Sequence, residues 1–184
     1  SHGDTKHVCL HPANPEECFY FAVAAFDLAE RLQTPVMVLS DLDIGMNDWM
    51  CRDLKWDDAW QPDRGKVLPL EEIVKLEKFH RFLDKDDDGI PYRTLPGVHP
   101  KAAYFTRGSG HNQYGAYTED STEYQIVVDR LVRKFHTARS LVPRPVFGMA
   151  STRTDVGIVA AGSSDGAVRE ALDAVWKVNP VARG

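Results

Sequence analysis

The stretch "VCLHPANPEECFYFAVAAFDLAERLQTPVMVLS", residues 8–40, decides the fold class. It opens with a short apolar run at 8–10, and Asn14 then supplies a side chain suited to cap a helix. Apolar residues recur at intervals of three and four through 15–32, which predicts a helix there. The run at 36–40 is largely apolar without alternation and predicts an interior strand. A strand, a helix and a second strand within this length form a βαβ unit, so we expect the two strands to be parallel.

The segment that follows, residues 45–115, shows little periodicity and holds many proline, glycine and aromatic residues. A short helix near 69–82 is the one regular element predicted within it. Because an irregular segment of this length is unusual inside a compact domain, we expect it to wrap another surface, in the same chain or in a neighbouring one. Trp49, Trp56 and Trp60 would anchor it there, and packing of these side chains in a local core is the alternative.

The later part of the chain returns to regular patterns. Helical spacing of apolar residues predicts a long helix over 119–141, and the stretch at 142–154 has the proline and polar content of a linker. A strand is predicted at 156–161, followed by a Gly–Ser turn and a helix from about Asp165. Together these elements predict an α/β fold with a partial parallel sheet and helices. Three parallel strands are fewer than an independent sheet usually has, so we expect a piece of a longer polypeptide, or a subunit completed by partners.

The overall composition limits the classes of function. The chain has 184 residues, a net charge of -5 and no long basic run, so a nucleic-acid partner is not expected. No apolar run approaches the ~20 residues that a membrane-spanning helix needs, so a membrane partner is not expected either. The three cysteines have no CxxC spacing, and we expect free thiols in a reducing cytoplasm.

The acidic stretch "LDKDDDGIPYRTLPGVHP", residues 83–100, begins like a calcium-binding loop. An EF-hand loop has oxygen ligands at alternate positions, glycine at position 6 and a bidentate glutamate at position 12. The matching groups are Asp84, Asp86, Asp88 and Gly89 at positions 1, 3, 5 and 6, and the carbonyl of Ile90 at position 7. Leu95 stands at position 12, so a true EF-hand is not expected. Two alternatives stay open: a weaker calcium or magnesium site formed by the same groups, and a solvated turn whose aspartates bond their own backbone.

Two further stretches carry candidate ligand groups. Asp41 and Asp43 follow the second predicted strand, where functional groups gather in α/β sheets, and could serve as metal ligands or as a base. The alternative is that they cap turns. The residues "GSSDG", 162–166, join a predicted strand to a helix and either bind an anion or form an ordinary turn. The histidines show no HxH or HExxH spacing, so a zinc site is not indicated.

Three parts of the sequence together are similar to a known family. They are residues 1–50, from "SHGDTKHVCLHP" to "GMNDWM", then "DGIPYRTLPGVHPKAAYFTRGSGHNQYG" at 88–115, and "RLVRKFHTA" at 130–138. In this order they resemble the alpha subunit of 2-oxoacid:ferredoxin oxidoreductases, the thiamine-diphosphate-dependent enzymes of the pyruvate and 2-oxoglutarate type. The resemblance covers about residues 1–175.

The resemblance implies a domain arrangement and an activity. Residues 1–141 would form the C-terminal part of a pyrimidine-type thiamine-binding domain with an extended arm and a long helix. A linker would follow at 142–154, and 155–184 would be the first strand–helix unit of a transketolase-C-terminal-like domain. Complete enzymes of this family oxidatively decarboxylate a 2-oxoacid, 2-oxoglutarate or pyruvate, with coenzyme A and pass electrons through iron–sulfur clusters to ferredoxin. Their beta subunit supplies the site for magnesium and the diphosphate of the thiamine cofactor.

The resemblance assigns no catalytic residue to these positions, because the activating glutamate and the substrate loops of the family lie upstream of Ser1. His2 and Asp4 match a family loop that we expect near the active site. The isolated chain is therefore expected to be inactive and to self-associate, with the beta subunit as its partner in the complete complex. Two other functions stay open from the residues alone: a calcium- or magnesium-binding module based on the aspartates at 84–88, and a non-catalytic interaction domain. The sequence does not indicate which 2-oxoacid is used.

Overall fold

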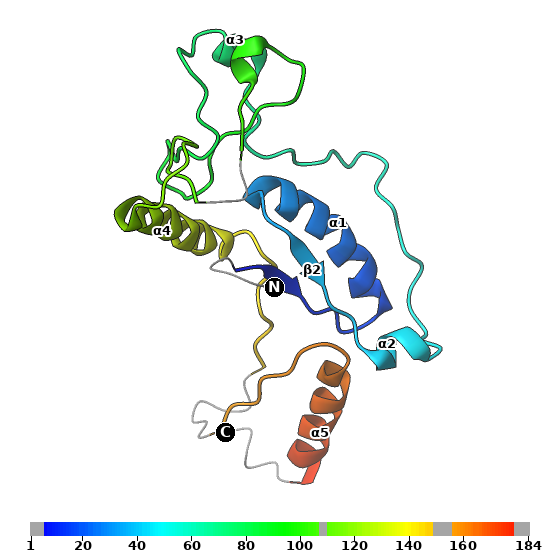
Figure 1. Cartoon of the computed structure of the whole chain (residues 1–184). Coiled ribbons are helices and arrows are strands. Elements are labelled where there is room, and N and C mark those ends of the chain that lie inside the picture. The colour runs from blue at the N-terminus through cyan, green and yellow to red at the C-terminus, as the bar shows by residue number, and fades with distance from the viewer. Residues whose placement is uncertain (1–5, 107–109, 149–155, 179–184) are drawn as a thin grey trace. The chain divides into compact units, whose positions relative to one another are not determined.

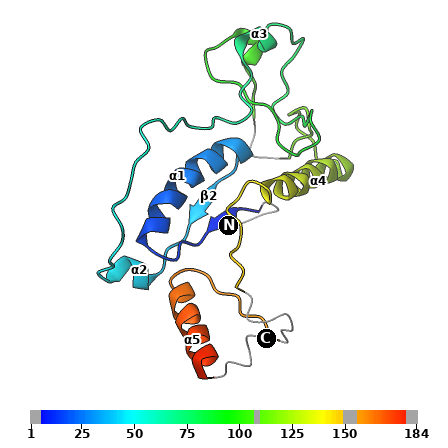
Figure 2. The same cartoon turned by 180° about the vertical axis from the view of Figure 1, so that it is seen from behind.

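The computed structural model describes residues 6–106, 110–148 and 156–178 (Figures 1 and 2). Strand β1 (Val8–Leu10), helix α1 (Pro15–Leu32) and strand β2 (Val36–Val38) follow one another along the chain. The two strands pair in parallel, with Val8 opposite Val36 and Leu10 opposite Val38. The predicted βαβ unit is therefore confirmed, and with it the α/β class.

Local side-chain chemistry explains where α1 begins and ends. Asn14 Oδ1 accepts a hydrogen bond from the Glu17 amide at 2.9 Å, and the Glu17 carboxylate accepts one from the Ala13 amide at 2.8 Å. This reciprocal pair satisfies amides that the first turn of a helix leaves without partners. At the other end, Gln33 has a φ of 51°, a left-handed conformation that stops the helix directly after the buried Leu32.

The chain divides into two compact units, and each is described by itself. Unit 1 comprises Ser1–His7, Asp27–Pro35 and Gln61–Val142, and unit 2 comprises Val8–Phe26, Val36–Trp60 and Pro143–Gly184. The division passes through α1, so neither unit is one continuous stretch of sequence. The domain boundaries expected at 141 and 155 stay a prediction.

Unit 2 contains both strands, helix α2 (Leu42–Met46) and helix α5 (Ser164–Val178). The helix predicted from about Asp165 is confirmed. The strand predicted at 156–161 is not formed, since β1 and β2 are the strands within the described residues. Val156 and Val159 are 77% and 99% exposed. An apolar run of this kind becomes a strand when a neighbouring strand takes its backbone hydrogen bonds, and the described residues place none beside it.

Unit 1 contains helix α3 (Leu70–Ile73), a 3₁₀ turn at Pro100–Ala102 and helix α4 (Ser121–Ala138). The long helix predicted over 119–141 is confirmed with slightly shorter bounds. Its first turn is capped by Asp120, whose carboxylate accepts hydrogen bonds from the amides of Thr122 and Glu123. No helix of the described residues combines the length and apolar character needed to cross a membrane.

Helix α3 is much shorter than the helix predicted over 69–82, and a distant lysine explains the difference. Lys101 Nζ donates hydrogen bonds to the carbonyls of Val74 and Leu76 at 2.9 and 2.8 Å. A continuing helix would use these carbonyls for its own hydrogen bonds, four residues further along. The Lys101 ammonium therefore stabilises a chain path that leaves the helix after one turn.

The tryptophans of the irregular segment make local contacts in unit 2. The ring of Trp56 contacts those of Phe19 and Trp60, with centroids 6.2 and 5.7 Å away. The Trp49 indole donates to the backbone carbonyl of Asp43 at 2.9 Å. These contacts favour local packing over the wrapping of a separate surface, although Trp56 stays 55% exposed.

Candidate functional site

A lysine lies among the oxygens that were predicted to hold a metal ion. Lys66 Nζ donates to Asp86 Oδ2 at 2.6 Å, to Asp88 Oδ1 at 2.9 Å and to the Ile90 carbonyl at 3.1 Å. Burial alone would lower the pKa of Lys66, but hydrogen bonds to Asp86 and Asp88 raise it above its ordinary value. The hydrogen bond from Lys66 is in turn the main reason why the pKa of Asp86 is lowered. Lys66 is therefore charged at neutral pH and neutralises this part of the loop.

A second cation reaches the same loop from α4. The Arg133 guanidinium lies 3.2 Å from Asp84 Oδ2 and 3.1 Å from Asp87 Oδ1. The side chain of Asp84 is only 6% exposed, and it also accepts a hydrogen bond from the Gly89 amide at 2.8 Å. Asp84 is thus a buried side chain that joins the loop to Arg133 and to its own backbone at Gly89.

The acidic loop is docked on α4 through its backbone. The Gly89 carbonyl accepts a hydrogen bond from Arg130 Nη1 at 3.0 Å, and the Asp88 carbonyl accepts one from Thr137 Oγ1 at 2.7 Å. Gly89 has a φ of 82°, and a Cβ placed there would lie 2.1 Å from the backbone nitrogen of Lys134. The glycine that matched position 6 of a calcium loop is therefore required for close contact with a helix.

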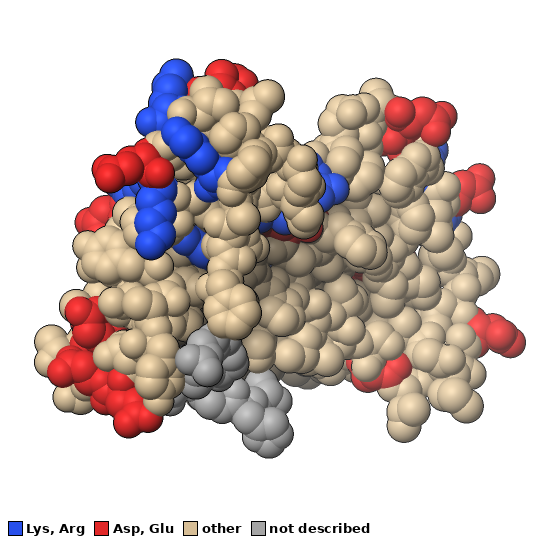
Figure 3. Space-filling view, turned by 45° about the horizontal axis from the view of Figure 1, so that its top comes forward, with Lys and Arg blue, Asp and Glu red and all other residues tan. Residues whose placement is uncertain are grey.

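These contacts change how the aspartates are interpreted. Among the described residues, no group of three or more His, Cys, Asp or Glu side chains is arranged to hold a metal ion. The cationic side chains at this loop come from the chain itself, and Figure 3 shows Lys and Arg side chains gathered near Asp and Glu on the face that it draws. A weak calcium or magnesium site on Asp84, Asp86, Asp88 and the Ile90 carbonyl stays a prediction, and any divalent ion there has to displace Lys66.

At the predicted anion site in unit 2, a side chain of the protein likewise takes the place of the expected ligand. Asp41 caps α2 by accepting a hydrogen bond from the Ile44 amide at 3.0 Å, and its second oxygen accepts one from the Ser163 amide at 2.8 Å. The Ser163 amide lies just before α5, so the carboxylate occupies the position of an anion at that helix N-terminus. Gly162 makes this approach possible, because a Cβ there would lie 2.7 Å from Asp41 Oδ2. Asp43 also serves the turn, by accepting a hydrogen bond from the Asn47 side chain.

The contact between Asp41 and Ser163 is expected to weaken in acid. Backbone hydrogen bonds from Ser163 and Ile44 lower the pKa of Asp41 below its ordinary value near 3.8. The stabilisation is therefore present above that value and is lost as the pH falls through the lower, folded-state pKa. We predict that amide hydrogen exchange at Ser163, corrected for its intrinsic pH dependence, becomes less protected below about pH 4. In Asp41→Asn the protection at neutral pH should already be reduced, and unchanged protection in that variant would contradict this role.

Residues 162–166 also fit the G-x-S-x-G pattern of a nucleophile elbow, a signal that the sequence analysis missed. The hydroxyl of Ser164 donates a hydrogen bond to the Ala161 carbonyl at 2.7 Å. A serine nucleophile needs a base that takes its proton, most often a histidine. The observed bond satisfies a turn instead, so the geometry does not support a nucleophile.

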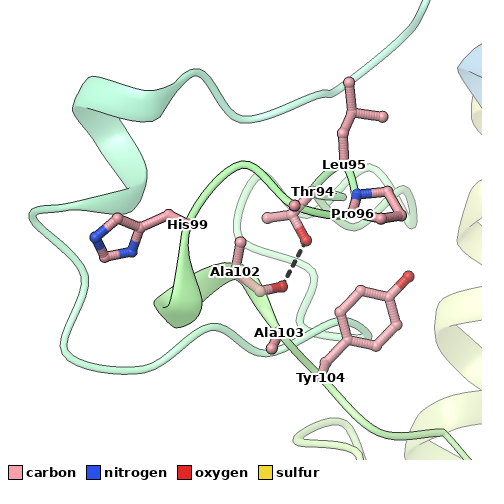
Figure 4. Close-up of a pocket in the computed structure, with 8 residues that line it drawn as sticks. Thr94, Leu95, Pro96, His99, Ala102, Ala103 and Tyr104 are labelled. Carbon is pink, nitrogen blue, oxygen red and sulfur yellow. Dashed lines mark hydrogen bonds between the residues drawn. The ribbon is translucent and has the colours of Figure 1, made fainter.

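Unit 1 also contains a pocket of about 430 Å³ (Figure 4). It is lined by Thr94, Leu95, Pro96, Gly97, His99, Ala102, Ala103 and Tyr104. The Thr94 hydroxyl donates to the Ala102 carbonyl at 2.8 Å, and His99 Nδ1 accepts from the Lys101 amide at 3.1 Å. In Figure 4, His99 and Tyr104 lie on opposite sides of this segment. The polar groups of the pocket are therefore used by the backbone or point apart, and they do not converge on a ligand.

Comparisons with known proteins show what the chain is similar to. Residues 2–52 match the family described as "Pyruvate flavodoxin/ferredoxin oxidoreductase, thiamine diP-bdg". The chain is 31% identical over 177 residues to the 2-oxoacid:ferredoxin oxidoreductase 2 subunit alpha of Aeropyrum pernix, in an alignment that covers 94% of this chain and 26% of the relative. The resemblance to these alpha subunits is confirmed.

Other 2-oxoacid oxidoreductase subunits match part or nearly all of the chain. The 2-oxoglutarate synthase subunit KorA of Methanothermobacter thermautotrophicus is 49% identical over 92 residues, which are 50% of this chain and 22% of the relative. A solved 2-oxoglutarate:ferredoxin oxidoreductase from Magnetococcus marinus has a TM-score of 0.71 at 20% identity, covering 97% of this chain and 30% of that chain. This structural likeness supports the fold. The chain spans about a quarter of the length of the curated alpha subunits that it matches over most of its residues.

The described part of the matched segment, residues 6–52, contains two of the acidic side chains that the sequence analysis singled out. Its two acidic candidates, Asp41 and Asp43, are both used in the turn around α2. His2 and Asp4, which match the loop expected near the active site of the oxidoreductases, lie outside the described residues.

Proposed function

We propose that this chain is part of the alpha subunit of an enzyme complex that oxidatively decarboxylates a 2-oxoacid with coenzyme A and passes the electrons to ferredoxin. The observation that carries the proposal is the alignment with named alpha subunits over 94% of the chain, together with the family match at residues 2–52. Relatives named 2-oxoglutarate synthase support 2-oxoglutarate as the substrate, with pyruvate as the alternative.

The cofactors, partners and location follow from the same proposal. Thiamine diphosphate is supported by the description of the matched family. Magnesium, an iron–sulfur cluster, the beta subunit and association between copies are proposed for the complete complex from the family resemblance. The exposed apolar side chains of Leu42, Met46 and Met50, at 80%, 78% and 99%, are consistent with a chain that contacts other subunits. Three unpaired cysteines support a reducing compartment, the cytoplasm.

The proposal is tested by dye reduction. The isolated chain is expected to reduce no viologen when it is supplied with 2-oxoglutarate, coenzyme A and thiamine diphosphate, because the described residues assemble no catalytic group. Addition of the remainder of the alpha polypeptide and the beta subunit should produce reduction, which omission of coenzyme A abolishes. A parallel assay with pyruvate separates the two substrates. Turnover by these 184 residues alone, or none by the assembled subunits with either substrate, would contradict the proposal.

A further inference from the structure

The segment that follows α3 has the sequence pattern of a helix, but its observed structure is not helical. The apolar side chains of Ile73, Leu76, Phe79 and Leu83 recur at intervals of three, three and four residues, which places them on one face of a helix. Helix α3 nevertheless ends at Ile73, and residues 74–82 form turns and irregular chain. The segment therefore prefers one conformation and is held in another.

The hydrogen bonds of Lys101 compete directly with extension of the helix. Lys101 Nζ donates to the carbonyls of Val74 and Leu76 at 2.9 and 2.8 Å. In a longer helix the same two carbonyls would accept hydrogen bonds from the amides of Lys78 and His80, four residues further along. Within the described residues, neither of these amides donates a backbone hydrogen bond. The two arrangements therefore use the same acceptors.

Burial of the segment does not by itself select the shorter helix. Ile73 is 0% exposed and Phe79 is 7% exposed, so both side chains are buried in the observed structure. On an extended helix they would form the two edges of one apolar stripe, with Leu76 between them. Both conformations thus allow the same side chains to face the interior. The hydrogen bonds of Lys101 are then the contacts that distinguish the two conformations.

The same residues connect this segment to the pocket of unit 1. Lys101 lies in the 3₁₀ turn Pro100–Ala102, and Ala102 and Tyr104 both line the pocket (Figure 4). The centroid of the Phe79 ring lies 5.6 Å from that of the Tyr104 ring. A change in the path of residues 74–82 would therefore alter contacts of the pocket wall.

We propose that residues 70–82 form a two-state element whose conformation is set by Lys101. In the observed state the Lys101 ammonium holds two carbonyls, and α3 ends after one turn. In the other state Lys101 leaves these carbonyls, α3 extends toward residue 82, and the Phe79 ring moves relative to Tyr104 in the pocket wall. The element lies in unit 1, and its assignment does not depend on the proposed oxidoreductase activity.

Lys101→Met tests this proposal in the full chain. Methionine keeps a flexible unbranched side chain but has no donor for the two carbonyls. Hydrogen exchange at the amides of Lys78 and His80 is expected to slow about tenfold or more, because both amides are hydrogen-bonded in the extended helix. Far-UV circular dichroism should show more helix than in the native chain, and the ring resonances of Tyr104 should shift.

Two controls separate helix extension from other effects of the substitution. Lys85→Met removes an equal charge from an exposed position on the acidic loop, and it should leave all three readouts unchanged. Addition of Glu77→Gly to Lys101→Met should reverse the changes, since glycine in a helix interior opposes extension. Native or faster exchange at Lys78 and His80 in Lys101→Met would overturn the proposal, whether or not the amides of α4 keep their protection.

Discussion

Replacing Gly89 by alanine is expected to lower the free energy of unfolding of unit 1 by about 3 kcal/mol or more. Two effects add at this residue. Its φ of 82° is strained for any residue with a side chain, and the new Cβ would lie 2.1 Å from the backbone nitrogen of Lys134 and 2.7 Å from the Arg130 carbonyl. These atoms belong to α4 and cannot move without breaking its hydrogen bonds. The loop must therefore leave the helix, with loss of the bonds that Arg130 and Thr137 make to it.

Gly97→Ala is the matched control for this prediction. Gly97 has a φ of 81°, nearly the same as that of Gly89, but a Cβ there would meet no atom within 4 Å. Its substitution should show the conformational cost alone, about 1–2 kcal/mol. Chemical denaturation of both variants, with hydrogen exchange of the α4 amides as the local readout, gives the two values. Equal losses would mean that contact with α4 is not what requires glycine at position 89.

The elements that could be predicted from the sequence are those whose determinants lie close together along the chain. Helix α1 was predicted over 15–32 and is observed at Pro15–Leu32, because its cap and its proline are adjacent in sequence. Helix α4 followed from the spacing of its apolar residues and from Asp120. The parallel pairing of β1 and β2 followed from the length of the connection between them.

The wrong predictions concern elements whose outcome depends on distant partners. The helix predicted over 69–82 ends after one turn because Lys101, far along the chain, takes two of its carbonyls. The strand predicted at 156–161 has an apolar pattern that suits a strand, but the described residues offer no neighbour for it. Periodicity indicates only the local preference of a segment, and it shows neither a distant hydrogen-bond donor nor the absence of a neighbouring strand.

At the candidate sites, too, the outcome depends on residues that lie far along the chain. The acidic loop and the turn at 162–166 both have the composition of ligand-binding loops, and each instead receives a charged group from the chain. Lys66 stands where a cation was expected, and Asp41 stands where an anion was expected. In both places the side chain that the protein supplies has the same sign of charge as the ligand that was considered from the sequence. The source of that charge could not be predicted, because Lys66 lies 20 residues from Asp86 and Asp41 lies 122 residues from Ser163.

Replacing Lys66 by alanine is therefore expected to make the acidic loop responsive to calcium. Removal of the ammonium leaves Asp86, Asp88 and the Ile90 carbonyl without their shared donor. Because the two carboxylates are partly exposed to solvent, the expected loss of stability is about 1–2 kcal/mol. Calcium prefers oxygen ligands of this kind, so it should bind the variant about tenfold or more tightly than the native chain. The expected result is a lower unfolding temperature for Lys66→Ala, partly restored by millimolar calcium.

Lys85→Ala separates this effect from a change in net charge. Lys85 lies in the same loop and is exposed, so its removal changes the charge of the loop equally but leaves Lys66 in place. Calcium should affect Lys85→Ala no more than it affects the native chain. If the native chain and Lys66→Ala bind calcium equally, then Lys66 does not compete with the ion, and the loop holds its metal with other groups. If neither binds, the three carboxylates are structural acceptors of hydrogen bonds, and their spacing carries no information about a metal.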